Sequence, residues 1–144
     1  MKSKKFLHLV SGAVVLAFVF FAVASSDDKS TEKEISETDL ASAIHISAST
    51  LYEDYDANEI SADQKYKGKV LVITGRIESI GKDITDNIYV ALEGDGFINV
   101  VQCMFSDDHV SETSELRKGQ SVKIKGRCSG QTLGSIIVRG CSLQ

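Results

Sequence analysis

The sequence predicts an all-β fold with accessory helices, in which five strands close into a small barrel. Five stretches are rich in β-branched residues or alternate apolar and polar residues, as strands do. One helix start precedes the first stretch, and another lies between the third and fourth. Gly75 and Gly126 stand in mid-strand, where sharp curvature favours a residue without a side chain. This order of elements is that of the OB-fold, a five-stranded Greek-key barrel. The competing layout is an open antiparallel sheet with helices on one face.

The apolar pattern sets the expected strand boundaries. Leu71, Ile73 and Ile77 alternate along the first strand, and Ile88, Val90 and Leu92 along the second. We expect strands at residues 69–80, 88–92, 97–105, 121–127 and 135–141. Residues 93–96 are expected to form a tight hairpin connection, and residues 129–134 a flexible loop.

Capping residues mark the expected helices. Thr50 and Glu53 fit a capping box, which predicts a helix over residues 49–57. A second short turn is expected through residues 62–66, with Gly68 as its stop. The helix between strands three and four is expected to begin at residues 106–108 and to end before Gly119.

Composition and charge limit the function. The 144 residues suit one domain; 42% are apolar and 25% are charged, as in ordinary globular chains. Proline is absent, which excludes proline-rich linkers. The net charge of −4 repels phosphate at long range, so capture of nucleic acid by bulk charge is not expected.

The N-terminal 24 residues resemble a targeting segment. Three lysines within the first five residues precede an almost wholly apolar run at residues 9–23, and Ala22-Val23-Ala24 fits the small-x-small rule for signal-peptide cleavage. Because residues 6–26 carry no formal charge, a retained membrane anchor is the alternative. In both cases we expect the rest of the chain to be exported, to the periplasm or another extracytoplasmic site. No cysteine follows the run, so a bacterial lipid anchor is not indicated.

Residues 25–46 are polar and largely acidic, without a sustained apolar period. This composition predicts a disordered acidic spacer. The expected organisation is therefore a signal peptide or anchor at 1–24, the spacer at 25–46 and an OB-fold domain at 47–144.

Short motifs along the predicted domain resemble a known family. They include Tyr66-Lys67-Gly68-Lys69 at the entry to the first strand, Val101-Gln102-Cys103 in the third, and Lys125-Gly126-Arg127-Cys128 with Cys141 near the end. The chain resembles the bacterial tRNA_anti-like proteins, small exported OB-fold domains, over residues 47–143. The resemblance implies a barrel and an envelope location. The link to nucleic acid in the family name comes from the fold, which does not by itself assign a function.

Three cysteines permit several arrangements. Cys103, Cys128 and Cys141 could form one disulfide in an oxidising compartment, with one thiol left over, and the sequence does not choose the pair. Neighbouring third and fifth strands would let Cys103 and Cys141 approach. The alternative is buried thiols that pack as small apolar residues.

Neither metal binding nor catalysis is indicated. The cysteines are 25 and 13 residues apart, with none of the close pairs typical of zinc sites. Helix capping explains Asp107 and Asp108 beside His109 better than metal ligation does. A nucleophilic pair of Cys103 and His109 is disfavoured because Cys103 is expected to face inward. We therefore expect no catalytic residue, no metal and no cofactor.

The usual OB-fold binding face consists of the outside of strands two and three with the loops after strands one and four. The candidate ligand-binding residues are Arg76, Lys82, Tyr89, Gln102, Met104 and Gln131. Phe97 is a further candidate for stacking. The basic stripe of Lys123, Lys125 and Arg127 is interpreted as the solvated side of an alternating strand.

These features predict an exported, non-catalytic binding module of the cell envelope, whose partner is a protein, peptide or glycan. The alternative is a nucleic-acid-binding OB domain that uses Lys82, Tyr89 and the basic stripe.

Overall fold

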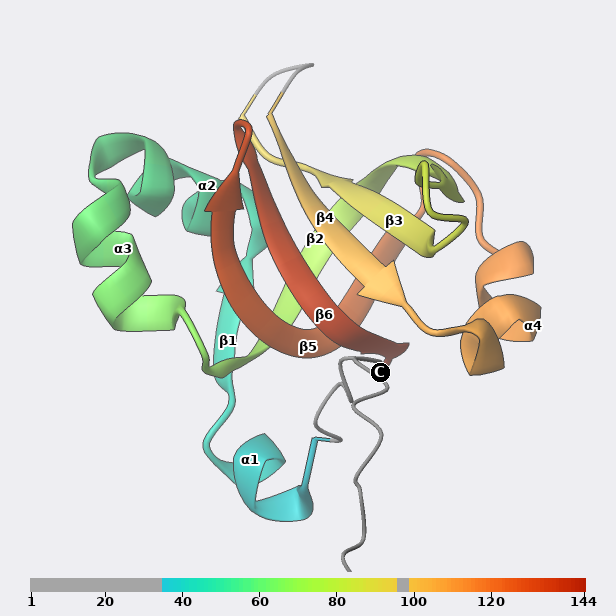
Figure 1. Ribbon diagram of the computed structural model, residues 1–144, viewed down its shortest axis with the longest axis horizontal. Helices are drawn as coiled ribbons and strands as arrows, with labels where there is room; N and C mark the ends of the chain where they lie inside the picture. Colours follow the sequence, from blue (N-terminus) through green and yellow to red (C-terminus); the bar gives the residue numbers. More distant parts are fainter. Residues whose placement is uncertain (1–34, 96–98) are drawn as a thin grey trace, which may run out of the picture. The chain divides into compact units, whose positions relative to one another are not determined.

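The computed structural model describes residues 35–95 and 99–144 (Figure 1). The expected targeting segment, residues 25–34 of the expected spacer, and Phe97 lie outside the described residues. Within the described ranges, no helix has the length and apolar character needed to cross a membrane.

The strands form one closed sheet with an added edge strand. In chain order the elements are α1 (Glu37–Ala41), β1 (Ile44–Ser47), α2 (Ala48–Ala57), α3 (Glu59–Tyr66), β2 (Val70–Lys82), β3 (Ile88–Glu93), β4 (Val100–Phe105), the 3-10 helix η1 (Asp107–His109), α4 (Val110–Ser114), β5 (Ser121–Thr132) and β6 (Ser135–Leu143). The sheet order is β1-β2-β3-β4-β6-β5, and β2 also pairs with β5. Strands β2 to β6 therefore form a closed five-stranded barrel, which confirms the predicted OB-fold.

Strand β2 closes the barrel because it has two partners along its length. Its first half pairs with β5, from Val70↔Arg127 to Arg76↔Ser121, and its second half pairs with β3. Gly75 lies near this change of partner. A Cβ built on Gly75 would lie 3.0 Å from the Cβ of Ala48 and 3.1 Å from that of Leu92, so the glycine allows α2 and β3 to approach. The close approach confirms the predicted role of Gly75.

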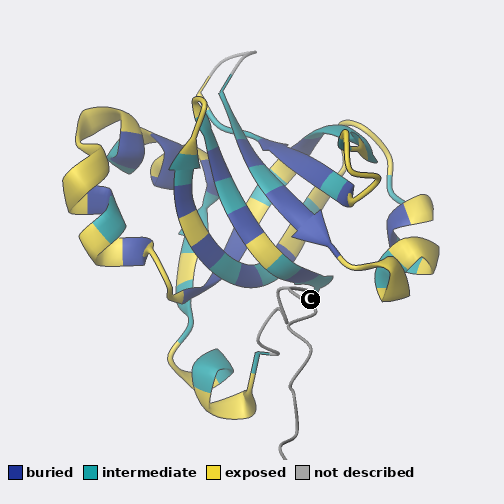
Figure 2. Ribbon diagram, viewed as in Figure 1, coloured by how far each residue is buried: buried dark blue, intermediate teal, exposed yellow. Residues whose placement is uncertain are grey.

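Alternation along the strands builds the core. Figure 2 shows buried positions alternating with more exposed ones along β5. The inward side chains form one apolar cluster, closed at one end of the barrel by residues of α2 and α3. Its largest fully buried members are Tyr55, Tyr66, Leu51, Leu71, Ile73, Ile77, Leu92, Ile124 and Ile136. A polar contact supports this end cap, where the Tyr55 hydroxyl donates to Asp63 Oδ1 at 3.0 Å.

Part of the predicted spacer is ordered. Residues 37–46, expected to be disordered, contribute α1 and most of β1. Strand β1 runs parallel to β2, from Ile44↔Leu71 to Ser47↔Thr74. A four-residue strand whose partner lies 27 positions away leaves no local periodicity, so the sequence pattern does not show it. Helix α1 carries a capping box between Ser36 and Asp39 that the sequence analysis did not identify.

The helices before β2 start differently from the prediction. The N-cap of α2 is Ser47, whose side chain accepts from the Thr50 amide at 3.1 Å, so the predicted capping box at Thr50 is wrong. Helix α3 is capped by Asn58, and Gly68 follows it at φ +79°, as expected for a helix stop.

Two later elements also differ. The predicted helix from residue 106 is a 3-10 turn followed by the short α4, and Ser106 makes no side-chain cap. Residues 129–132, predicted as loop, continue β5 through a bulge between Cys128 and Gly130. Gly130 has φ +94°, so it shapes a bulge and does not interrupt the strand. Leu133 and Gly134, both at positive φ, then form a two-residue hairpin turn.

Crowding at Gly126 gives a test of barrel closure. A Cβ there would lie 2.6 Å from Val138 Cγ1, 2.7 Å from Cys141 Sγ and 3.0 Å from the Arg139 carbonyl oxygen. We expect Gly126→Ala to lower the free energy of unfolding by about 1–3 kcal/mol through overpacking, measured by urea denaturation. Gly68→Ala is the matched control, because nothing lies within 4 Å and only its positive φ opposes the methyl group. A smaller loss at Gly126 than at Gly68 would contradict this account of barrel packing.

Candidate ligand-binding groove

An open groove lies on the outer side of the barrel, over β3, β4 and the second half of β2. Its volume is about 410 Å³. It is lined by Ser79, Lys82, Asp83, Ile84, Tyr89, Ala91, Val100 and Gln102. Three of the six predicted site residues, Lys82, Tyr89 and Gln102, therefore come together here.

The strand register builds the groove floor. Val90 and Leu92 of β3 face the core, so Tyr89 and Ala91 face outward. Across the β3–β4 pair, Tyr89 lies opposite Met104 and Ala91 opposite Gln102. Ala91 is only 3% exposed and Met104 only 8%, yet neither belongs to the main core cluster. They form a second packed layer on the outside of the barrel, next to the polar side chain of Gln102.

Tyr89 is positioned by a glycine on the neighbouring strand. Gly81 and Tyr89 are paired in the β2–β3 register. A Cβ built on Gly81 would lie 3.0 Å from Tyr89 Oη and 3.2 Å from Cζ, so the phenol lies directly against the Gly81 backbone. Residues 81–87 have the composition of a turn, but Gly81 belongs to β2. The pairing of Gly81 with Tyr89 depends on the register between β2 and β3, which the sequence alone does not give.

The loop between β2 and β3 forms one wall of the groove and is held by Asp83. Its Oδ1 accepts from the Thr85 amide at 2.8 Å, the Thr85 hydroxyl at 2.7 Å and the Asn87 amide at 3.0 Å. Hydrogen bonding, first of all from the Thr85 side chain, lowers the pKa of the Asp83 carboxyl to about 2. Ile84 projects from this loop and is fully exposed. These hydrogen bonds hold the loop in its observed conformation.

The groove carries little free positive charge. Lys82 Nζ lies 3.0 Å from Asp86 Oδ2, and the Asp83 carboxylate lines the same space. The groove therefore combines an apolar floor, one aromatic ring, amide and hydroxyl groups, and a compensated cation.

The other predicted site residues lie elsewhere. Arg76 is on β2 outside the groove lining, with its Nε 3.6 Å from Glu93 Oε1. Gln131 pairs with Ile136 near the tip of the β5–β6 hairpin and does not line the groove. Met104 does not line the groove. It is the cross-strand partner of Tyr89, which does. The lining residues Ser79, Asp83, Ile84, Ala91 and Val100 were not predicted.

The strand register separates Cys103 from Cys141 along the barrel. Cys103 and Cys128 are buried, free thiols. Parallel pairing aligns Cys103 with Val138, which places Cys141 three residues further along β6, or about 10 Å. Cys141 Sγ donates to the Val138 carbonyl at 3.4 Å. Burial raises the pKa of the Cys128 thiol, whose sulfur lies 3.4 Å from the Tyr55 hydroxyl.

His109 stands apart from these thiols. Its Nδ1 contacts Glu112 Oε1, and its ring packs edge-on to Phe105 at 6.0 Å between centroids. Within the described ranges, no three histidine, cysteine or acidic side chains gather as a metal site.

The described residues from β2 to β6 form an OB-fold barrel with a groove on its outer face. The sequence matches the tRNA_anti-like family over residues 1–142, so the chain belongs to this family.

Solved structures share the fold at low identity. A protein from Klebsiella pneumoniae, described as a candidate nucleic acid-binding lipoprotein, is 18% identical, with a TM-score of 0.61 over 76% of this chain and 98% of that one. The asparaginyl-tRNA synthetase of Entamoeba histolytica is 16% identical, with a TM-score of 0.40 over 54% of this chain and 21% of that one. The replication factor A related protein of Methanobacterium thermoautotrophicum is 14% identical, with a TM-score of 0.41 over 54% and 81%. No curated protein matches the chain.

The bonds of Asp83 predict the acid response of the groove wall. Because the folded-state pKa lies below the ordinary value of 3.8, the loop should keep its full order above pH 3.8 and lose it as the pH falls through about 2. NMR amide exchange at Thr85 and Asn87 measures this order. Asp83→Ala should speed exchange at both amides already at neutral pH. Asp86→Asn is the control, since it removes the Lys82 ion pair and leaves the Asp83 bonds. Equal exchange in the two variants would show that Asp83 does not hold the loop.

A count of reactive thiols in the unfolded protein tests whether the chain contains a disulfide. We expect three reactive thiols per chain when protein purified without reductant is unfolded in guanidinium and treated with a thiol reagent. In the folded protein we expect much slower modification, because all three sulfurs are buried. A single reactive thiol after unfolding would instead demonstrate a disulfide.

Proposed function

We propose that this protein is an exported, non-catalytic OB-fold module that binds a protein, peptide or glycan segment of the cell envelope in the β3–β4 groove. The observation that carries this proposal is the groove itself, which is lined by the apolar side chains of Ala91 and Val100, the loop held by Asp83, and the ring of Tyr89 packed against Gly81. Concave sites of this kind bind by apolar contact and use a few polar groups for orientation.

The groove chemistry favours a ligand without strong negative charge. A Tyr ring can stack on a sugar face or on an apolar side chain, and Gln102 and Ser79 offer hydrogen-bonding groups beside it. Single-strand nucleic-acid sites pair stacking rings with a basic groove. Here Lys82 is already bound to Asp86, and Asp83 adds negative charge.

Export is supported by the N-terminal sequence. Three lysines, an uncharged apolar run and a small-x-small triplet occur in the order expected of an export signal. A protein of the same fold is described as a candidate lipoprotein, which agrees with an extracytoplasmic role.

Absence of catalysis is supported by the placement of the reactive groups. Cys103 is a buried thiol on the inner side of β4, whereas the imidazole of His109 is engaged by Glu112. Among the described residues this leaves Cys103 without the adjacent base that a nucleophile requires.

Nucleic acid binding is the second candidate. The Tyr89 ring, held against Gly81, is a suitable platform for one base. The Klebsiella pneumoniae protein of similar fold is described as a candidate nucleic acid binder. In this alternative Lys82, Tyr89 and the stripe at Lys123, Lys125 and Arg127 would hold the strand.

One titration separates the two candidates. Isotope-labelled full chain is titrated with muropeptides, which carry both glycan and peptide, and separately with a dT12 oligonucleotide, at low and high salt. We expect muropeptides to shift the amide signals of Ser79, Tyr89 and Gln102 with little salt dependence. Tyr89→Ala should weaken binding about tenfold through lost stacking, a change of about 1.4 kcal/mol.

Arg76→Ala is the control variant because Arg76 lies on β2 outside the groove, and it should bind muropeptides as the native chain does. Oligonucleotide binding that weakens steeply with salt and disappears in Tyr89→Ala would establish the nucleic acid alternative. Muropeptide shifts confined to residues outside the groove would remove the groove from the proposal.

A further inference from the structure

A second surface, basic and distinct from the groove, lies on the outer side of β5 and β6. Ile124, Gly126 and Cys128 of β5 are buried, so the residues between them face outward. Arg139 is an exposed residue of β6 and stands directly opposite Arg127 in the register. We call the set Lys123, Lys125, Arg127 and Arg139 the β5–β6 basic face.

The charges of this face are largely uncompensated. Arg127 is paired with Asp39 of α1, whereas among the described residues the other three cations of the face have no such partner. Across residues 35–95 and 99–144, Lys123, Lys125 and Arg139 form no ion pair. Elsewhere in those ranges cations do pair with carboxylates: Lys65 with Asp54, Lys67 with Asp63, Arg76 with Glu93, Lys82 with Asp86 and Lys118 with Glu78. In a chain of net charge −4, this concentration of free cations points to an external anion.

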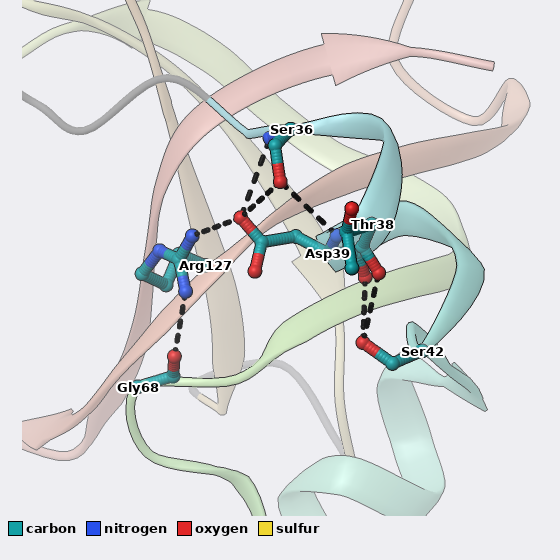
Figure 3. A network of polar contacts seen from close by, with 6 residues as sticks. All are labelled: Ser36, Thr38, Asp39, Ser42, Gly68 and Arg127. Atoms are coloured by element: carbon teal, nitrogen blue, oxygen red, sulfur yellow. Dashed lines mark hydrogen bonds and ion pairs between the residues drawn. The ribbon is translucent and has the colours of Figure 1, made fainter.

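Arg127 also marks where the N-terminal part of the described chain meets the barrel. Its Nη2 lies 3.1 Å from Asp39 Oδ2 of α1, and its Nη1 donates to the Gly68 carbonyl at 2.8 Å (Figure 3). The same Asp39 oxygen accepts from the amide of Ser36, the N-cap of α1. The chain therefore enters the described fold beside the basic face.

The entry point limits how far the face can be from a membrane. If the uncharged segment at residues 6–26 is a retained membrane anchor, residues 27–34 connect it to the described chain. Eight residues extend over at most about 29 Å. The described domain is then tethered within about that distance of the lipid surface.

The order of the strands around the barrel determines which side of the domain carries the groove. Around the ring the strands follow as β2, β3, β4, β6 and β5, so the middle of the β3–β4 pair lies across the barrel from β5. A surface in contact with β5 leaves the groove on the far side.

We propose that the β5–β6 basic face rests on a membrane surface that carries anionic lipid headgroups, and that this contact turns the β3–β4 groove away from the membrane. Exposed lysines and arginines are attracted to such surfaces within a Debye length. This surface is separate from the proposed ligand groove and can be tested without any groove ligand.

A nucleic acid strand is the less suitable partner for this face. Neither β5 nor β6 contains an aromatic residue, so bases would find no stacking platform. A sheet of headgroups requires only distributed positive charge.

Lysine footprinting on the full chain tests the contact. The protein is reconstituted into phosphatidylcholine vesicles with or without 30% phosphatidylglycerol and treated with a membrane-impermeant acylating reagent. Modification is then measured for each lysine by mass spectrometry. We expect labelling of Lys123 and Lys125 to fall at least threefold in the anionic vesicles and to recover in 0.5 M salt. Lys82, in the groove, is the internal control and should label equally in both.

Arg139→Glu is the variant of choice because Arg139 is exposed, forms no ion pair among the described residues, and stands opposite Arg127, so a carboxylate there reverses the charge beside a cation. It should abolish the protection of Lys123 and Lys125 in anionic vesicles, with the thermal midpoint unchanged or raised. Three results would overturn the proposal: equal labelling in both vesicle types, protection of Lys82 in their place, or protection by dT12 without protection by anionic vesicles. The last would assign the face to nucleic acid.

Discussion

The shared pairing of β2 is the constraint on which the rest of the structure depends. This strand of 13 residues pairs with β5 along its first half and with β3 along its second. The change of partner joins the two ends of the sheet, which hides the edges that an open sheet would expose. It also requires β2 to bend, and Gly75 and the irregularity between Ile77 and Ser79 lie at the bend.

Closure divides every strand into an inner and an outer set of side chains. The inner set forms a compact apolar cluster. The outer set differs around the ring: β3 and β4 present Tyr89, Ala91, Gln102 and Met104, whereas β5 presents lysines and an arginine. The same alternation thus produces an apolar groove and a basic face on opposite sides of one small barrel. Two different contacts can be made at once because neither surface interrupts the core.

The segments before β2 contribute to the packing of the barrel. Helices α2 and α3 close one end, where Tyr55 and Tyr66 are fully buried, and Ser47 ends β1 while capping α2. Through Asp39 and Arg127, α1 joins the incoming chain to β5. The region expected to be a passive spacer is therefore partly a structural element, and it fixes where the N-terminal sequence meets the domain.

The sequence by itself determined the strand pattern, the OB-fold order and the outward placement of Tyr89 and Gln102, because the alternation of apolar and polar residues is a local signal. Only the tertiary structure decided which outward residues share a site. In the tertiary structure Tyr89 packs against Gly81 and lines the groove together with Lys82. Arg76 and Gln131 lie outside the groove. The tertiary structure also paired β1 with β2 and set Cys103 opposite Val138. These outcomes depend on register between strands distant in sequence, and a shift of a few residues in that register, invisible in local composition, changes every neighbour.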